Sequence, residues 1–270
     1  MRSIEKINHI ICVASGKGGV GKSTTAVNLA LALSSMGRKV GILDADIYGP
    51  SLPLMMGVPD GTRPKIQDKK FMLPLVAHGI ECNSMGFLVD QKTAMVWRAP
   101  MIISAFNQIL NDTAWSELDY LIVDMPPGTG DIQLSLAQSV KVSGAVIVTT
   151  PQDVALLDAR KGIEMFKKVN VPILGVVENM STHTCSKCGH EEAIFGSGGG
   201  ARLSAEYGVD VIGRLPLDLA IRETTDAGNP VVASNKDHVA TKAYMELAAN
   251  VEKSLAGARS DAPSISISDD

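Results

Sequence analysis

Residues 15–24 read Ser-Gly-Lys-Gly-Gly-Val-Gly-Lys-Ser-Thr, and this stretch decides the fold. It follows the apolar run Ile-Ile-Cys-Val at 10–13 and leads into Ala-Val-Asn-Leu-Ala-Leu-Ala-Leu at 26–33, which predicts a strand, a glycine-rich loop and a helix in turn. Glycines let such a loop turn tightly, so that its backbone N–H groups and the helix N-terminus surround a phosphate. The motif therefore predicts a phosphate-binding loop, in which Lys22 reaches the β- and γ-phosphates of a nucleotide and the Ser23 hydroxyl ligates Mg²⁺.

Short β-branched runs alternate with helical patterns along the rest of the chain. Most of the runs are apolar throughout, as expected of strands covered by helices on both faces. The alternation predicts an α/β fold with a doubly wound, mostly parallel sheet flanked by helices. The expected strands are 10–13, 39–43, 79–83, 120–123, 145–149, 172–177 and 209–212, and the expected helices are 23–36, 101–111, 132–139, 154–169, 200–207 and 238–255.

Two segments interrupt this alternation: 48–71, rich in Pro and Gly, and 182–200, which contains a pair of cysteines. Both are expected to be loops, because the strands resume after each. Residues 1–256 are expected to form a single P-loop domain with the 182–200 loop inserted. The small, polar and acidic end, 257–270, is expected to be a disordered tail.

Composition limits the classes of function. The chain has 270 residues, of which 45% are hydrophobic and 20% charged, enough for one large core. The net charge of −4 and the lack of clustered Lys and Arg argue against a nucleic-acid partner. No apolar stretch is as long as a membrane span, and the start, Met-Arg-Ser-Ile-Glu-Lys, lacks the apolar core of a signal peptide. A cytoplasmic protein without a membrane partner is expected.

Carboxylates follow two of the predicted strands. Asp44 and Asp46 come after strand 39–43, and Asp124 comes after the four apolar residues 120–123, which is the Walker B form. Ligands of an open α/β sheet gather at the carboxyl ends of its strands, so these carboxylates are expected to lie near a magnesium nucleotide. Solvated loop aspartates, or one aspartate that caps a helix, are the alternative.

Pro-Pro-Gly at 126–128 follows directly and makes a rigid corner. We expect Gly128 to donate its N–H to a γ-phosphate as part of a switch.

Cys185 and Cys188 form a Cys-x-x-Cys pair, which supplies half of a tetrahedral sulfur site. A symmetric dimer supplies the other half, so that the two pairs hold one [4Fe-4S] cluster at the subunit interface. With His183 and His190 the pair also reads His-x-Cys-x-x-Cys-x-His, which is an alternative site for one structural Zn²⁺ within a single chain.

Two further interpretations concern a redox role for the Cys-x-x-Cys pair and the two other cysteines. A redox disulfide is disfavoured for the Cys-x-x-Cys pair, because it does not lie at a helix N-terminus. Cys12 and Cys82 fall within predicted strands and are expected to be buried apolar residues.

Several motifs, in order, resemble the Mrp/ApbC iron-sulfur cluster carrier ATPases, which share the deviant P-loop of the MinD, ParA and nitrogenase iron protein class. The resemblance runs from about residue 8 to about residue 250. Ala99 stands where many relatives have glycine, which leaves the purpose of the 97–101 loop open. The matching segments are 16–24, 44–51, 97–101, 124–134, 178–181, Cys-x-x-Cys at 185–188, and 195–200.

The resemblance implies a MinD-like P-loop NTPase fold and a homodimer that hydrolyses ATP slowly and passes a [4Fe-4S] cluster to apo iron-sulfur proteins. It implies that Lys17 reaches the partner's nucleotide, that Asp46 orients the attacking water and that Asp44 supports Mg²⁺ through bound water. The segments at 178–181 and 214–218 resemble the adenine-contacting segments of this class; Asn179 offers both an acceptor and donors to a base, and a simple turn is its alternative reading.

The expected site is therefore as follows. Catalytic roles fall to Lys17, Lys22 and Asp46; nucleotide contacts to Gly16, Lys17, Gly18, Gly19, Val20, Gly21, Lys22, Ser23, Thr24, Gly128, Asn179, Pro216 and Asp218; and metal contacts to Ser23, Asp44, Asp124, Cys185 and Cys188. The cofactors are ATP, Mg²⁺ and the [4Fe-4S] cluster.

Two other classes share the nucleotide site. A MinD- or ParA-like positioning ATPase with a structural zinc loop needs a membrane-seeking helix or a basic DNA-binding face, and the end of this chain, Ser-Ile-Ser-Ile-Ser-Asp-Asp, offers neither. An electron-transfer reductase like the nitrogenase iron protein places its cysteines singly in two segments. The carrier is the favoured reading.

Overall fold

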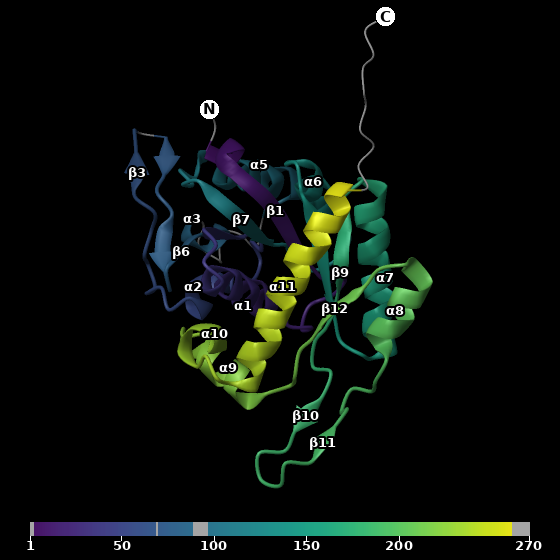
Figure 1. The fold of residues 1–270 in the computed structure, drawn as a ribbon. Coiled ribbons are helices and arrows are strands. Elements are labelled where there is room, and N and C mark those ends of the chain that lie inside the picture. The colour runs from purple at the N-terminus through teal and green to yellow at the C-terminus, as the bar shows by residue number, and fades with distance from the viewer. Residues whose placement is uncertain (1–2, 69, 89–96, 261–270) are drawn as a thin grey trace, which may run out of the picture.

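The centre of the protein is an eight-stranded sheet with the order β12-β9-β8-β1-β7-β2-β6-β5 (Figure 1). The computed structural model describes residues 3–68, 70–88 and 97–260. Neighbouring strands run parallel, except that the edge strand β5 is antiparallel to β6. The strands of this sheet are β1 (Ile7–Ala14), β2 (Val40–Asp44), β5 (Leu75–Ala77), β6 (Ile80–Ser84), β7 (Leu118–Asp124), β8 (Gly144–Thr149), β9 (Ile173–Glu178) and β12 (Val211–Arg214).

Helices cover both faces of the sheet. Helices α1, α10 and α11 pack with one cluster of buried side chains, and α5, α6, α7 and α8 pack with a second cluster on the other face. The helices are the 3₁₀ turn η1 (Ser3–Lys6), α1 (Lys22–Ser35), α2 (Leu52–Met55), α3 (Met85–Leu88), α5 (Ala99–Asp112), α6 (Asp131–Gln138), α7 (Asp153–Lys168), α8 (Gly199–Tyr207), α9 (Leu219–Asp226), α10 (Val231–Ser234) and α11 (Val239–Ser260).

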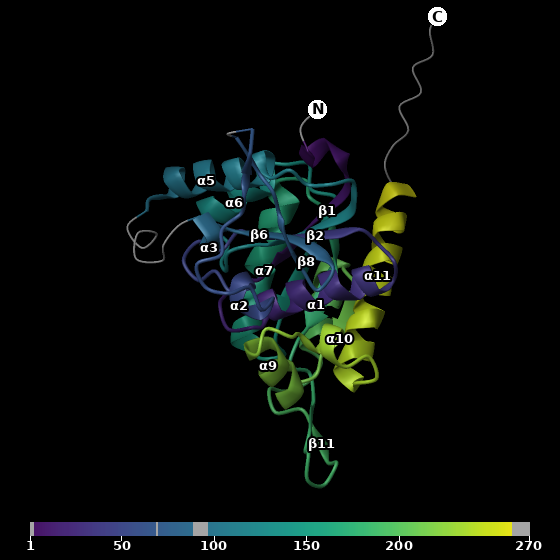
Figure 2. The same ribbon diagram turned by 90° about the vertical axis from the view of Figure 1, so that its left-hand side faces the viewer.

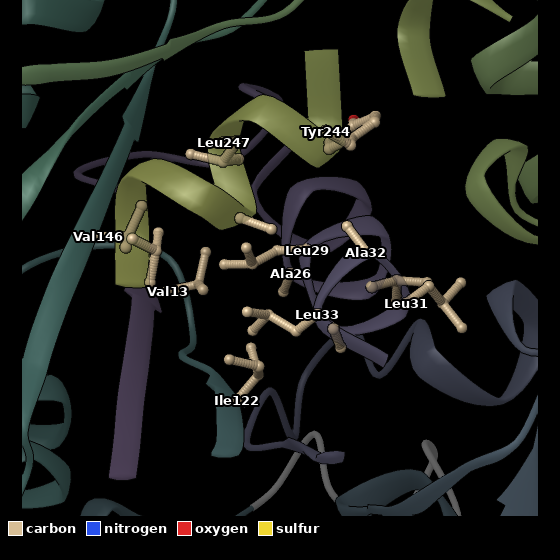
Figure 3. Close-up of a cluster of buried hydrophobic side chains, with 14 of the residues drawn as sticks. Val13, Ala26, Leu29, Leu31, Ala32, Leu33, Ile122, Val146, Tyr244 and Leu247 are labelled. Carbon is tan, nitrogen blue, oxygen red and sulfur yellow. The ribbon is translucent and has the colours of Figure 1, made fainter. Parts of the chain in front are cut away.

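Helix α1 lies between the sheet and α11, which explains why its residues 25–33 are all buried. Leu29 and Leu33 are fully buried and lie beside Val13 of β1 and Ile122 of β7, while Leu247 of α11 covers them from the other side (Figure 3). Truncating one such leucine to alanine costs about 2–5 kcal/mol. The helix that follows the glycine-rich loop is therefore fixed rigidly beneath it.

Two short hairpins lie outside the main sheet. One pairs β3 (Ile66–Gln67) with β4 (Phe71–Met72), and the other pairs β10 (His183–Thr184) with β11 (Glu191–Glu192). The β10–β11 hairpin projects from one end of the molecule, away from the sheet and beyond α9 and α10 (Figures 1 and 2). It carries the cysteine pair.

The predicted doubly wound α/β fold is confirmed, and each expected strand and helix lies within a few residues of an observed one. Segment 48–71 was expected to be a loop but contains α2 and β3 and enters β4. The tail was expected to begin at residue 257, and α11 continues to Ser260. The rest of that predicted tail, 261–270, lies outside the described residues.

Candidate functional site: a phosphate-binding loop and a cysteine hairpin

The glycine-rich loop joins β1 to α1 in the conformation that the motif predicts. Gly19 and Gly21 have φ angles of 83° and 82°, in the left-handed region that favours glycine, and Gly21 directly precedes α1. A side chain at Gly18 or Gly19 would meet no atom within 4 Å, so this part of the loop faces open space. At Gly16, by contrast, a Cβ would lie 2.1 Å from the carbonyl oxygen of Asp158 in α7, so only glycine fits there.

Lys22 is buried at the first position of α1 and pairs with the Asp124 carboxylate at the end of β7. Its ammonium group also donates to the Ser23 hydroxyl, with Nζ and Oγ 3.0 Å apart. Burial raises the pKa of Asp124, and the neighbouring Lys22 opposes that rise. The lysine thus stands beside the carboxylate that ends β7.

Asp44 lies next to Asp124 across β2 and β7, at the carboxyl end of the sheet. Its carboxylate accepts hydrogen bonds from the backbone N–H groups of Asp46 at 3.0 Å and of Leu52 at 3.2 Å, and from the Ser84 hydroxyl at 3.0 Å. Leu52 is the first residue of α2, so Asp44 also holds the start of that helix. Burial and the nearby Asp124 raise the pKa of Asp44 to about 7, with Lys22 acting in the opposite direction.

Asp46 is half-buried, and one of its carboxylate oxygens accepts the N–H groups of Tyr48 and Gly49, each at 3.1 Å. The negative charge of Asp46 also raises the pKa of Asp124. Gly128, expected to donate to a γ-phosphate, instead donates its N–H to the Ser15 carbonyl at 2.9 Å. That bond must break before the predicted switch contact can form.

The other predicted loop residues also surround this edge of the sheet. Lys17 is half-exposed, and its carbonyl accepts the Ser15 hydroxyl at 2.8 Å. Val20 is buried, while the half-buried Thr24 accepts the Asn28 side-chain amide at 2.9 Å through its carbonyl.

The residues expected to contact a base occupy two neighbouring segments. Asn179 is buried after β9 and donates its side-chain amide to the Val20 carbonyl at 2.8 Å, so it touches the glycine-rich loop directly. Pro216 and Asp218 follow β12. The Asp218 carboxylate caps α9 by accepting the Ala220 N–H at 2.7 Å. Both polar side chains therefore have partners within the chain.

The two cysteines of the pair lie on the turn of the β10–β11 hairpin, and Cys185 lines the same pocket as Pro216 and Asp218. Cys185 is half-buried and Cys188 exposed. The Cys185 N–H donates to the His190 carbonyl, and the Gly189 N–H donates to the Cys185 carbonyl, each at 2.9 Å. Hydrogen bonds from the N–H groups of Lys187 and Cys188 lower the pKa of the Cys185 thiol, which favours the thiolate that binds metal.

The single-chain zinc alternative has little support in this geometry. No group of three or more His, Cys, Asp or Glu side chains within residues 3–68, 70–88 and 97–260 is placed to hold a metal ion. His183, one of its four ligands, bonds the Leu217 carbonyl through Nδ1 at 3.0 Å, a contact that is compatible with metal binding through Nε2. Cys12 and Cys82, by contrast, are buried in β1 and β6 as predicted, and burial raises the pKa of each thiol.

Sequence reasoning missed two residues. Ser84 pairs with Asp44 across β2 and β6 and fixes its carboxylate, and its position just after the predicted strand 79–83 was the available signal. His183 was considered only as a zinc ligand, whereas its contact with Leu217 joins segments 34 residues apart. No local pattern predicts that contact.

Together, the open glycine-rich loop, the buried lysine and the two carboxylates at the ends of β2 and β7 define a P-loop NTPase of the MinD/ParA type. A family model described as ParA, NUBPL iron-transfer P-loop NTPase, matches residues 6–252, and the chain belongs to this family.

The names of similar proteins support the same family assignment. The chain is 59% identical over 252 residues to the "Iron-sulfur cluster carrier protein" of Pseudomonas fragi, which covers 93% of this chain and 88% of the relative. It is 56% identical to the protein of the same name from Escherichia coli strain K12, over 93% of this chain and 68% of the relative. It is 52% identical to the "Iron-sulfur cluster transfer protein NUBPL" of Mus musculus, over 94% of this chain and 80% of the relative.

Solved structures place the fold in the same class. A nucleotide-binding protein from Archaeoglobus fulgidus in complex with ADP superposes with a TM-score of 0.74 at 38% identity, over 84% of this chain and 88% of that chain. The cell division ATPase MinD of Pyrococcus furiosus superposes with a TM-score of 0.70 at 27% identity, over 91% and 99% of the two chains. Within the described residues, no helix has the length and apolar character to cross a membrane.

Proposed function

We propose that this protein binds and slowly hydrolyses ATP and carries a [4Fe-4S] cluster, held between two copies of the chain, to apo iron-sulfur proteins. The cysteine hairpin is the observation that carries this proposal. It presents two accessible thiols on one turn, on the same chain as a phosphate-binding loop. The names of the relatives, iron-sulfur cluster carrier and transfer proteins, support the same function.

The residues at the carboxyl end of the sheet fit a magnesium nucleotide. No atom lies within 4 Å of where a Cβ at Gly18 or Gly19 would stand, and the backbone of the loop supplies N–H donors for a phosphate. Lys22 is close enough to exchange Asp124 for a phosphate, and Ser23 would then ligate Mg²⁺. Asp124 would support the metal through bound water. The metal's positive charge would favour ionised carboxylates at this site.

Hydrolysis needs a positioned water and a neutralised phosphate. We assign water positioning to Asp46, whose negative charge raises the pKa of Asp124. Lys17 is assigned to the partner subunit's nucleotide, since it is half-exposed on the loop rather than buried like Lys22. Asn179, Pro216 and Asp218 are assigned to the adenine.

The cluster is the cargo, and its ligand count argues for two chains. A [4Fe-4S] cluster takes four thiolates, whereas one hairpin offers Cys185 and Cys188. Cys12 and Cys82 are buried in the sheet and do not reach the hairpin. A two-fold axis at the hairpin supplies the missing pair from a second copy. ATP acts on cargo release only through a difference in its affinity for the loaded and empty forms.

A transfer assay tests the proposal. The protein is loaded anaerobically and mixed, in the presence of an iron chelator, with an apo-protein that takes a [4Fe-4S] cluster. We expect the acceptor to gain its cluster faster than from free iron and sulfide, and we expect Mg-ATP to change the rate. A Lys22→Ala protein should transfer without any response to ATP. An acceptor that gains nothing beyond the free-iron control would contradict the carrier function.

A further inference from the structure

The cysteine hairpin, defined here as residues 183–196, makes one hydrogen bond to the rest of the described chain beyond its covalent ends. The imidazole Nδ1 of His183 bonds the Leu217 carbonyl oxygen at 3.0 Å. Among the hydrogen bonds and ion pairs of the described residues, no other joins the cysteine hairpin to the remainder of the chain. A carbonyl oxygen only accepts, so Nδ1 is the donor.

His183 extends a ladder of backbone hydrogen bonds between two segments. The Leu215 N–H donates to the Glu178 carbonyl at 3.0 Å, the Ser181 N–H donates to the Leu215 carbonyl at 2.9 Å, and the Leu217 N–H donates to the Thr182 carbonyl at 2.8 Å. The segment after β9 and the segment after β12 are therefore held together up to the first residue of the cysteine hairpin.

Both segments of the ladder also belong to the nucleotide site. Asn179 lies in the first segment and donates to the Val20 carbonyl of the phosphate-binding loop. Pro216 and Asp218 lie in the second, on either side of Leu217. A nucleotide that contacts these residues therefore acts on the same backbone that holds His183.

The cysteine hairpin has room to move about this point. A cavity of about 1160 Å³ lies between it and the starts of α9 and α11, lined on one side by Cys185 and His183 and on the other by Leu219 and Val239. Leu219 and Val239 remain 59% and 63% exposed, so the hairpin is not packed down onto them. Its orientation therefore depends on the His183 contact more than on packing.

We propose that His183 is a positioning residue that couples the nucleotide site to the cysteine hairpin, through its hydrogen bond to Leu217. The inference rests on the proposed function, because it gives the route by which ATP reaches the cluster site. In the nucleotide-bound protein, the segment around Leu217 shifts and the His183 bond carries that shift to Cys185.

Three variants separate this coupling from a general effect on the hairpin. His183→Leu removes the donor and replaces the imidazole with an apolar side chain of moderate size. His183→Asn keeps an N–H donor near the position of Nδ1 and should restore the coupling. His190→Leu is the matched control, because His190 lies two residues after Cys188 as His183 lies two residues before Cys185, and its side chain has no partner assigned to the ladder.

The measurement is the alkylation rate of Cys185 and Cys188 by iodoacetamide in the cluster-free protein, with and without Mg-ATP. Cys12 and Cys82 are buried and do not contribute. We expect Mg-ATP to change the rate about fivefold or more in the unaltered protein, in His183→Asn and in His190→Leu, and to leave it unchanged in His183→Leu. Mg-ATP affinity, measured in parallel by calorimetry, should be retained in all of them.

Two results would overturn the coupling: a nucleotide response that survives in His183→Leu, or no response in the unaltered protein. If His183→Leu and His190→Leu lost the nucleotide response of the alkylation rate equally, the coupling would also be overturned, in favour of a general role for the two imidazoles. Because the readout uses cluster-free protein, it fails separately from the carrier function, which is judged by iron per chain and by transfer.

Discussion

Three charged side chains meet at the carboxyl end of the sheet: Lys22, Asp44 and Asp124, all buried. One cation faces two carboxylates in a low-dielectric site, so one carboxylate is not fully compensated. This explains why burial raises the pKa of Asp44 to about 7 while Lys22 is engaged with Asp124. A bound Mg²⁺ would supply the missing positive charge.

The first prediction concerns the pH dependence of stability. The pKa of Asp44 is about 7 in the folded protein and that of an unfolded aspartate is about 3.9, so between these values the folded state holds a proton that the unfolded chain has lost. The Asp44 contribution to stability is therefore present at about pH 4 and is lost as the pH rises toward 7, by up to about 1.4 kcal/mol per unit.

Urea unfolding at pH 5 and pH 7 checks this, with Asp44→Asn as the comparison because an amide does not titrate in this range. The free energy of unfolding should fall more between pH 5 and pH 7 in the unaltered protein than in Asp44→Asn. Parallel pH profiles for the two proteins would contradict the prediction.

The second prediction compares two glycines of the phosphate-binding loop. Gly16→Ala places a Cβ 2.1 Å from the Asp158 carbonyl oxygen, so the loop or α7 must move, at a cost of about 2 kcal/mol or more. Gly18→Ala meets nothing within 4 Å and should leave the free energy of unfolding almost unchanged. Thermal unfolding of both variants checks this, and equal melting temperatures would count against the loop geometry described.

At the scale of elements, the β10–β11 hairpin projects from the molecule (Figure 1), while the two clusters of buried side chains lie on the faces of the main sheet. The third prediction follows. Cys185→Ala should abolish iron binding on reconstitution and leave Mg-ATP binding unchanged. It should change the free energy of unfolding by no more than about 0.5 kcal/mol, because the substitution lies on a half-exposed turn.

Cys82→Ala is the matched control for this prediction. Cys82 is buried in β6, far in sequence from the hairpin, and its removal should leave the iron content intact. If Cys185→Ala kept its full iron content, the ligand assignment would be wrong.

The elements show how far sequence reasoning reaches. The parallel strands were predicted because each is a buried apolar run, and the phosphate-binding loop because its residue types are fixed by phosphate geometry. The edge strand β5, only three residues long, and the one- to two-turn helices α2, α9 and α10 were missed, since they are too short to show a period.

Within the site, the sequence predicts which residues gather but not their partners. Asp44 and Asp124 were placed together because they end strands at one edge of a sheet. The bond from Gly128 to the Ser15 carbonyl and the bond from His183 to the Leu217 carbonyl depend on loops meeting across the fold, and no local pattern contains that information. The adenine, Mg²⁺ and cross-subunit assignments stay predictions.

At the scale of the whole molecule, the account requires two chains. The fourth prediction is that Lys17→Ala binds Mg-ATP as tightly as the unaltered protein but loses ATP-dependent dimer formation and hydrolysis, because Lys17 is assigned to the partner's nucleotide. Lys141→Ala, at an exposed position near the opposite end of the sheet, serves as the control. Sedimentation in the presence of Mg-ATP measures the dimer fraction, and an ATPase assay measures hydrolysis. An unchanged dimer fraction and an unchanged hydrolysis rate in Lys17→Ala would refute the cross-subunit role.

The most direct test of the carrier account is anaerobic reconstitution with iron and sulfide, with iron, zinc, visible absorption and oligomeric mass measured on one sample. The account predicts about two irons per chain, broad visible absorption and the mass of a dimer, as one [4Fe-4S] cluster shared by two hairpins requires. One tightly held zinc per chain, in a monomer that takes up no iron, would contradict it and make the cysteine hairpin a structural element of a nucleotide-dependent switch.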